Sequence, residues 1–156
     1  MNLQHYEINS TEDLNTYVFV SSGRNGDIFK IVQFTHIQSE SSSNRYNLAL
    51  GDWIDGRVED TPVTNNGDVK TVMATIGEIV TYYTQNFPER EIFAAGSTRN
   101  RSRLYQMLIS NNLAEIERNF EVFGIKYLDQ STDELESHAG KFEKTETYGA
   151  VLVIRK

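Results

Sequence analysis

Two strand-like runs joined by Asn25-Gly26 constrain the fold more than any other feature of the sequence. The runs at residues 17–24 and 27–34 are rich in β-branched and aromatic residues. Asn-Gly between such runs favours a type I′ turn, so a β-hairpin is predicted. A two-residue loop at Asn25-Gly26 would place Val20 opposite Ile31 in the hairpin. The chain is therefore expected to build on an antiparallel sheet.

The periodicity of the remaining chain predicts the element order β-β-β-α-β-α-α-β-β. Apolar residues between 69 and 83 recur at helical spacing, and this helix is expected to begin after Asn65 or Asn66 and to end before Pro88. The turn Gly96-Ser97-Thr98 is expected to lead into a second helix with Leu104, Met107, Leu108 and Ile109 on its apolar side. Asn112 and Glu115 have the spacing of a capping box for a further helix. Additional strands are expected at residues 46–50, 91–95, 120–128 and 148–154. The predicted fold class is α+β, with a mixed, mainly antiparallel sheet and helices on its faces.

One domain covering residues 1–156 is expected from this length. Residues 52–66 have an irregular pattern and are expected to form a connection held down by one aromatic anchor, Trp53. Residues 129–147 are polar and acidic, which predicts a flexible insertion. The apolar run at residues 148–154 predicts a strand inside the sheet.

Composition excludes several classes of function. The chain has no cysteine, which rules out disulfides, a thiolate nucleophile and cysteine-ligated metals. The histidines His5, His36 and His138 are too far apart in sequence to suggest a metal site, so no metal is expected. The formal charge of -7 disfavours sequence-independent nucleic-acid binding. No signal peptide or run of 18 apolar residues is visible, so a cytoplasmic protein that does not span a membrane is expected.

The most unusual local feature is a cluster of arginines at the expected start of a helix. Arg99, Arg101 and Arg103 follow the turn Gly96-Ser97-Thr98, and Asn100 lies among them. A helix N-terminus already carries partial positive charge, so cations there predict a nearby anion. We therefore assign the candidate ligand-binding residues Ser97, Thr98, Arg99, Asn100, Arg101 and Arg103.

Three kinds of anion remain open for this cluster: carboxylates of the chain itself, a small phosphate-bearing ligand, or an acidic or nucleic-acid partner. Gly67, in the turn before the first long helix, is a further candidate because glycine allows close backbone approach to a phosphate. Asp68 beside it also fits simple capping of that helix. Ser97 and Ser102 have no adjacent histidine, so a hydrolase triad has no support.

The element order resembles the core of the GCN5-related N-acetyltransferase superfamily, with three antiparallel strands, a helix, a strand, a helix and two closing strands. A short sequence pattern is also similar, since the strand at 92–95 is followed by Asn100 and then by Tyr105, as an Asn and a Tyr follow the corresponding strand in that superfamily. The chain further resembles a family of small uncharacterised bacterial proteins that carry Ser-Gly-Arg-Asn-Gly-Asp, here residues 22–27, and Gly-Ser-Thr followed by Arg-x-Arg-Leu-Tyr, here residues 96–105.

The acetyltransferase resemblance implies roles for particular residues. It implies that Tyr105 is a catalytic residue that protonates the departing coenzyme A thiolate, that residues 47–50 lie beside the acyl group, and that the turn at Gly67 meets the pyrophosphate of coenzyme A or acetyl-coenzyme A. The turn retains only the central glycine of that superfamily's phosphate-binding motif. Tyr105 also fits a core packing role beside Leu104 and Leu108.

Two functions are therefore carried forward. The first is an acetyltransferase-like domain of unknown substrate that binds a small phosphate-bearing ligand such as coenzyme A. The alternative is a non-enzymatic module that binds a protein partner in a bacterial defence or toxin-antitoxin system, with the acidic residues 133–146 as the contact surface.

Overall fold

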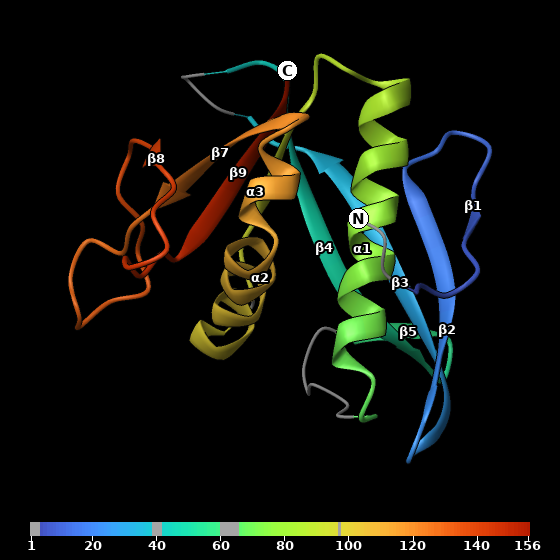
Figure 1. The fold of residues 1–156 in the computed structure, drawn as a ribbon. Coiled ribbons are helices and arrows are strands. Elements are labelled where there is room, and N and C mark those ends of the chain that lie inside the picture. The colour runs from blue at the N-terminus through green and yellow to red at the C-terminus, as the bar shows by residue number, and fades with distance from the viewer. Residues whose placement is uncertain (1–3, 39–41, 60–65, 97) are drawn as a thin grey trace. The chain divides into compact units, whose positions relative to one another are not determined.

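The computed structural model describes residues 4–38, 42–59, 66–96 and 98–156. The chain divides into two compact units: unit 1 comprises Met1–Thr35 and Ala49–Pro88, and unit 2 comprises His36–Leu48 and Glu89–Lys156. Its fold is α+β with a mixed, mainly antiparallel sheet, which confirms the fold class predicted from the sequence (Figure 1). No helix in the described part of the chain combines the length and apolar character needed to cross a membrane.

Unit 1 is built from antiparallel strands and one long helix. Its strand order is β1-β2-β3-β4, and β5 pairs antiparallel with β4, which begins in unit 2. Helix α1 follows these strands in the chain, at the position and length that its apolar period predicts. The elements are β1 (Asn9–Ser10), β2 (Thr16–Gly23), β3 (Gly26–His36), β4 (Arg45–Ile54), β5 (Arg57–Glu59) and α1 (Val69–Asn86).

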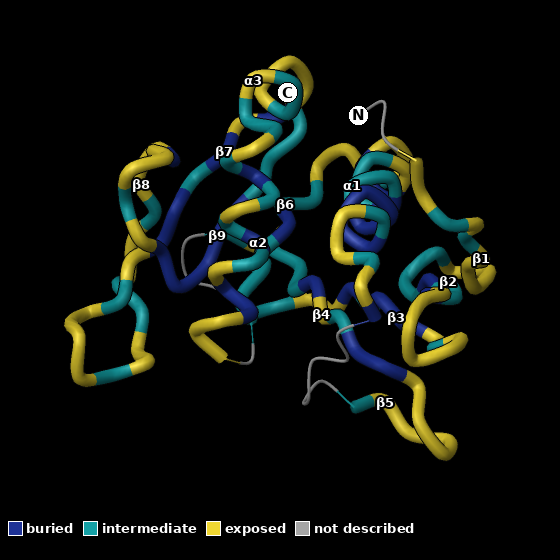
Figure 2. Tube along the Cα trace, turned by 60° about the horizontal axis from the view of Figure 1, so that its bottom comes forward, coloured by how far each residue is buried: buried dark blue, intermediate teal, exposed yellow. Residues whose placement is uncertain are grey.

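Aromatic rings fix the helix of unit 1 against its strands. Tyr83 of α1 stacks on Phe34 of β3 with ring centroids 3.7 Å apart, and Tyr17 of β2 meets Phe34 edge to face at 5.9 Å. All three side chains are buried. Offset and edge-to-face pairs add to the burial of apolar area, so this cluster is part of the core of the unit. Figure 2 shows buried stretches of the backbone in α1 and in the strands.

The predicted hairpin forms, but its register differs from the prediction. Val20 lies opposite Phe29, not Ile31, and the strands close at Gly23 opposite Gly26. The turn residues are therefore Arg24 and Asn25. A type I′ turn needs positive φ at both of its central residues, whereas among the described residues other than glycine only Leu14 and Asp55 have positive φ. Asn66, which is distant in the sequence, forms hydrogen bonds with Asn25 and Gly26 at this turn. The sequence of the hairpin itself does not indicate this contact.

Residues 52–59 also differ from the prediction of an irregular connection. They form the end of β4, a turn at Asp55-Gly56 and strand β5, with Trp53 opposite Val58. Asp55 and Gly56 have φ values of 49° and 77°, the combination that a type I′ turn requires. Trp53 is 46% exposed, so the proposed aromatic anchor is wrong.

Unit 2 has the strand order β4-β6-β9-β7-β8. The start of β4 pairs parallel with β6, from Arg45 opposite Glu91 to Asn47 opposite Phe93. Strand β9 pairs antiparallel with both β6 and β7, which confirms that the final apolar run lies inside the sheet. The elements are β6 (Glu91–Ala94), α2 (Arg99–Asn111), α3 (Leu113–Ile116), β7 (Phe120–Ile125), β8 (Gly140–Lys141) and β9 (Ala150–Arg155).

The core of unit 2 includes a side chain from the segment 129–147. Phe142 is buried together with Ile109 of α2, Val122 of β7 and Tyr148. The same segment contains β8, which pairs with β7. Residues 129–147 therefore contribute both to the sheet and to the core of this unit.

Two local predictions about the helices of unit 2 are wrong. Asn112 makes no side-chain capping bond to α3; its amide instead donates to the Leu108 carbonyl at 2.9 Å. The capping box is therefore absent. Met107, expected on the apolar side of α2, is half exposed, because the buried side of this helix carries Arg101, Ser102, Tyr105 and Ile109.

Candidate functional site

The turn before α2 packs tightly against the first turn of that helix. The Gly96 N–H donates to Ser102 Oγ at 2.9 Å, and a Cβ at position 96 would lie 2.3 Å from the Ser102 nitrogen. Thr98 Oγ1 accepts the Arg101 N–H at 3.2 Å, so Thr98 is the N-cap of α2. Thr98 therefore has a structural role at the site, and Ser97 lies outside the described residues.

Arg99 is bound by residues far away in the sequence. Its Nε lies 3.0 Å from Asp133 Oδ1, its Nη2 donates to the Thr132 carbonyl, and its guanidinium lies 3.8 Å from the ring centroid of Tyr127. A cavity of about 90 Å³ is lined by Gly96, Thr98, Arg99, Tyr127 and Asp133. The first of the three anions, a carboxylate of the chain itself, is therefore the one that the structure places at Arg99.

The loop that supplies Asp133 carries its own hydrogen bonds. Ser131 donates to Asp129 through both its hydroxyl and its backbone N–H, at 2.6 and 2.7 Å. These bonds hold the pKa of the Asp129 carboxyl below its usual range, and the positive charge of Arg99 lowers it further by a smaller amount. These bonds therefore favour the ionised form of the Asp129 carboxyl.

The other arginines of the cluster occupy different surroundings. Arg101 is 8% exposed, whereas Asn100 and Arg103 are exposed. Arg101 lies one helical turn before Tyr105, which is also buried. Burial raises the pKa of the Tyr105 phenol, and the charge of Arg101 partly opposes that rise. The structure thus joins Arg101 to Tyr105, and Arg99 to Tyr127 and Asp133.

Gly67 belongs to unit 1, where it precedes α1. Its φ of 79° lies in the left-handed region that favours glycine. A Cβ at this position would also lie 3.3 Å from the Arg24 guanidinium. Its backbone conformation therefore favours glycine, and the positive Arg24 side chain lies directly beside it.

Asn66 connects this turn to the β2–β3 hairpin. It is 2% exposed; its Oδ1 accepts the Asn25 N–H at 2.6 Å, and its Nδ2 donates to the Gly26 carbonyl at 2.9 Å. The Arg24 N–H donates to the Asn66 carbonyl at 3.2 Å. Asn66 therefore attaches the segment before α1 to the hairpin through hydrogen bonds, and we call this its latch role. Asn65, the other residue after which the helix was expected to begin, lies outside the described residues.

Asp68 occupies the N-cap position of α1 but makes no side-chain capping bond. Its Oδ2 accepts hydrogen bonds from Tyr6 Oη and Ser21 Oγ, both at 2.5 Å. Burial and the bond to Asp68 raise the pKa of the Tyr6 phenol. Two hydroxyl donors therefore satisfy the carboxylate, and the prediction of simple helix capping by Asp68 is wrong.

The sequence did not predict which residues lie beside Arg99 or which residues lie around the turn at Gly67. Tyr127 and Asp133 follow Arg99 by about 30 residues, and Tyr6, Ser21 and Arg24 precede Gly67 by more than 40. The motif at residues 22–27 was visible, but nothing local links it to Asn66. In the described part of the chain, no group of three or more His, Asp or Glu side chains could hold a metal ion.

Comparison with known proteins gives one match. The model of DUF6934, described as a family of unknown function, matches residues 2–156. No curated protein and no solved structure matches the chain significantly. Because the match covers almost the whole sequence, the chain belongs to the DUF6934 family.

Proposed function

We propose that this protein is an acyltransferase related in fold to the GCN5-related N-acetyltransferases, which moves an acyl group from acyl-coenzyme A to an amine and releases coenzyme A. The order of its long elements supports the proposal. Strands β2, β3 and β4 precede α1, and β6 follows it and pairs parallel with β4. Helix α2 then leads to β7 and β9, where the final strand lies between β6 and β7.

The burial and the raised pKa of Tyr105 are the observation that supports the chemical part of the proposal. A buried phenol whose pKa is raised keeps its proton at neutral pH, as a proton donor must. Arg101, one turn away and also buried, favours the phenolate that remains after the proton has left. Tyr105 is thus suited to give a proton to the departing thiolate and then to regain, through water, the proton that the attacking amine releases.

The turn before α1 supports binding of a phosphate. The start of α1 carries the partial positive charge of the helix dipole, Gly67 carries no side chain, and the Arg24 guanidinium adds a full positive charge beside it. Asp68 would repel a phosphate, but two short hydroxyl bonds spread its charge. These donors suit the phosphates of coenzyme A, which as acetyl-coenzyme A supplies an activated acyl thioester.

The test is release of free coenzyme A thiol from acetyl-coenzyme A, followed with a thiol reagent in the presence of a panel of primary amines. We expect Tyr105→Phe to lower kcat by about 10²-fold or more with little change in KM, since general acids typically contribute that much. Tyr82→Phe is the matched control, because Tyr82 is exposed on α1. No turnover with any amine, or full activity of Tyr105→Phe, would contradict the proposal.

A second candidate, a module that binds a protein partner, is favoured by the hairpin formed by β4 and β5. Trp53 and Val58 lie opposite each other and are 46% and 42% exposed, and Ile54 beside them is 41% exposed. Neighbouring exposed apolar side chains mark interaction surfaces. Co-purification with the product of an adjacent gene, abolished by Trp53→Ser with Val58→Ser but retained in Tyr105→Phe, would support this function over catalysis.

A further inference from the structure

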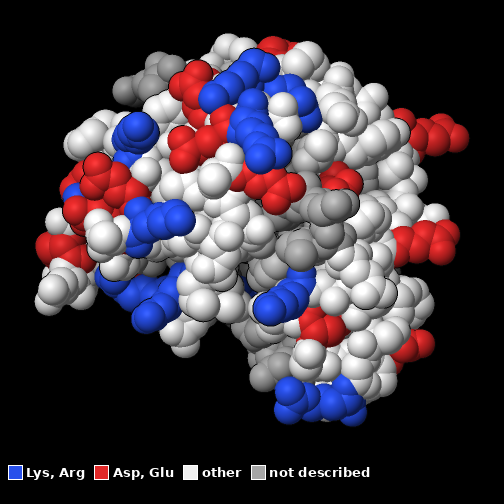
Figure 3. Space-filling model, in the orientation of Figure 1, with Lys and Arg blue, Asp and Glu red and all other residues white. Residues whose placement is uncertain are grey.

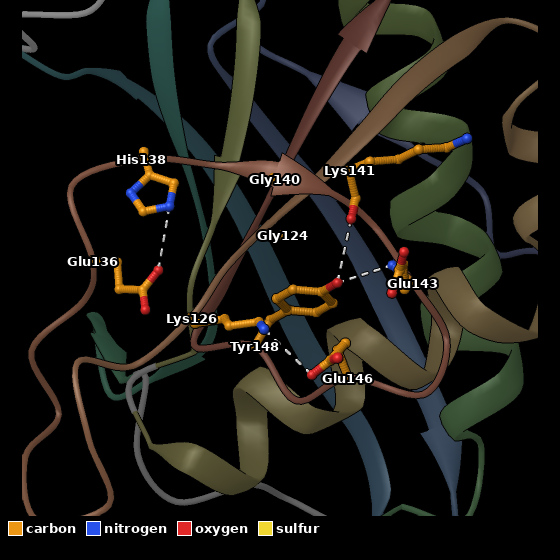
Figure 4. Close-up of a pocket in the computed structure, with 9 residues that line it drawn as sticks. All are labelled: Gly124, Lys126, Glu136, His138, Gly140, Lys141, Glu143, Glu146 and Tyr148. Atoms are coloured by element: carbon orange, nitrogen blue, oxygen red, sulfur yellow. Dashed lines mark hydrogen bonds and ion pairs between the residues drawn. The ribbon is translucent and has the colours of Figure 1, made fainter.

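A second and larger cavity lies in unit 2, and none of the residues that line it belongs to the lining of the cavity beside Arg99. Its volume is about 380 Å³, within the range of small-molecule sites. Strand β7 contributes Gly124, β8 contributes Gly140, and the segments next to these strands contribute Lys126, Glu136, Glu146 and Tyr148. Figure 4 shows Glu136 and His138 together on one side of the cavity and Lys126 with Glu146 on the other.

The floor of this cavity is rigid and preformed. The Tyr148 ring is buried, and its hydroxyl accepts the Glu143 N–H at 2.9 Å and donates to the Lys141 carbonyl at 3.4 Å. The Tyr148 N–H donates to Gln106 Oε1 of α2 at 3.1 Å. Position 124 must be glycine, because a Cβ there would lie 2.2 Å from the ring. A ligand would therefore find this surface already ordered, which lowers the entropic cost of binding.

The charges around this floor are only loosely satisfied. Lys126 Nζ lies 3.4 Å from Glu146 Oε2, and His138 Nε2 lies 3.6 Å from Glu136 Oε2. Charge-assisted hydrogen bonds are usually about 2.7–2.9 Å long, so neither pair is tightly bonded. Side chains of both pairs are partly exposed, and exposed ion pairs contribute little to stability. A ligand can therefore replace one member of each pair at small cost.

The mixture of signs indicates the class of ligand. A simple anion would meet the carboxylates of Glu136, Glu143 and Glu146, and a simple cation would meet Lys126. The Lys141 side chain points away from the cavity in Figure 4. Figure 3 shows acidic and basic side chains interspersed on the surface over β8 and its neighbouring loops. A molecule with one charge of each sign matches both sides of the cavity.

We propose that this cavity binds a small zwitterion of the amino-acid class. Its ammonium group lies against Glu136 and its carboxylate against Lys126, above the ring of Tyr148. Acyl transfer is not required for this binding, so the site is independent of the function proposed above. The chain should therefore bind the amino acid when no coenzyme A is present.

The first test is a titration of the ¹⁵N-labelled full chain with each of the twenty common amino acids. We expect at least one of them to shift the Gly124 and Gly140 amide signals saturably, because both glycines line the cavity. The amide of the best-binding amino acid lacks the carboxylate, and its N-acetyl derivative lacks the ammonium group. Each derivative is expected to bind at least tenfold more weakly than the parent amino acid.

Three variants locate the site. Lys126→Met and Glu136→Gln should each raise the Kd of the best-binding amino acid at least tenfold. Gly140→Val should also weaken binding, because a side chain there meets no atom within 4 Å and narrows the cavity without displacing a neighbour. Lys144→Met is the matched control, since Lys144 is exposed and lies outside the lining. The proposal is overturned if no amino acid shifts these signals, if a derivative binds as tightly as the parent, or if Lys126→Met binds normally.

Discussion

Replacing Asn66 with alanine tests how firmly the turn before α1 is attached to the hairpin. The substitution removes two short side-chain bonds, from the Asn25 N–H at 2.6 Å and to the Gly26 carbonyl at 2.9 Å. It also removes weaker bonds to Ser21 at 3.1 and 3.3 Å. Each net bond contributes about 0.5–1.5 kcal/mol, and a buried group left unpaired costs about 1–3 kcal/mol. Asn66→Ala should therefore lower the free energy of unfolding by about 2–4 kcal/mol.

Urea unfolding followed by tryptophan fluorescence measures this loss. The single tryptophan, Trp53, lies in unit 1 together with Asn66, so its emission reports on the relevant unit. Asn86→Ala is the control, because this exposed residue at the end of α1 makes one side-chain bond, to the Tyr82 carbonyl; we expect a change below about 0.5 kcal/mol. Equal and small losses in both variants would refute the latch role of Asn66.

Three further substitutions have defined expected results. Lys30→Ala should cost about 3–5 kcal/mol in urea unfolding because it removes the ammonium group that lies 2.5 Å from the buried Asp52 carboxylate, and Lys30→Met with Asp52→Leu should cost less than the single change. Tyr17→Phe should raise the free energy of unfolding by about 1 kcal/mol, since the buried hydroxyl of Tyr17 has no hydrogen-bond partner among the described residues. Burial raises the pKa of Tyr17 to about 12 from an ordinary 10.0, so the folded chain holds this proton longer and the free energy of unfolding falls from pH 10 to 12. Tyr17→Phe should make that fall smaller, and the raised pKa values of Tyr6 and Tyr105 should account for part of what remains. Gly124→Ala should destabilise by about 1–3 kcal/mol through overlap with the Tyr148 ring.

The fold class and the positions of the long elements could be predicted because they depend on local periodicity. The α1 pattern and the final apolar run each extend over several turns or residues, and both elements form where they were expected. The hairpin register could not be predicted, because Asn66, some 40 residues later, decides which residues form the turn. Tertiary hydrogen bonds outweighed the local preference of Asn25-Gly26.

The β4–β5 hairpin shows a missed signal of another kind. Asp55-Gly56 is itself a turn dipeptide, but β5 has only three residues, too few for a clear alternating pattern. Aromatic residues are usually well buried, so the residue type of Trp53 predicts an anchor, whereas the side chain is exposed on a hairpin. Residue type alone could not show whether Trp53 is a buried anchor or an exposed side chain on a hairpin.

At the candidate site, the sequence predicted an anion beside the arginines but not its source. Arg99 binds Asp133 and stacks on Tyr127, and both partners come from the segment after β7. The cavity above Tyr148 was not foreseen, because its lining comes from short stretches between residues 124 and 148 that have no shared motif. Such sites arise from loop packing, which single-sequence patterns do not encode.

Thermal unfolding of the full chain with acetyl-coenzyme A, coenzyme A and inorganic phosphate tests the proposed function most directly. A ligand that binds the folded state at 100 times its Kd stabilises it by about 2.7 kcal/mol, which corresponds to a rise in Tm of roughly 5–10 °C for a chain of this size. We expect this rise with both coenzyme A species, a reduced rise in Arg24→Ala, and none with phosphate alone. An unchanged Tm with acetyl-coenzyme A and coenzyme A at millimolar concentration would contradict acyl transfer by this protein.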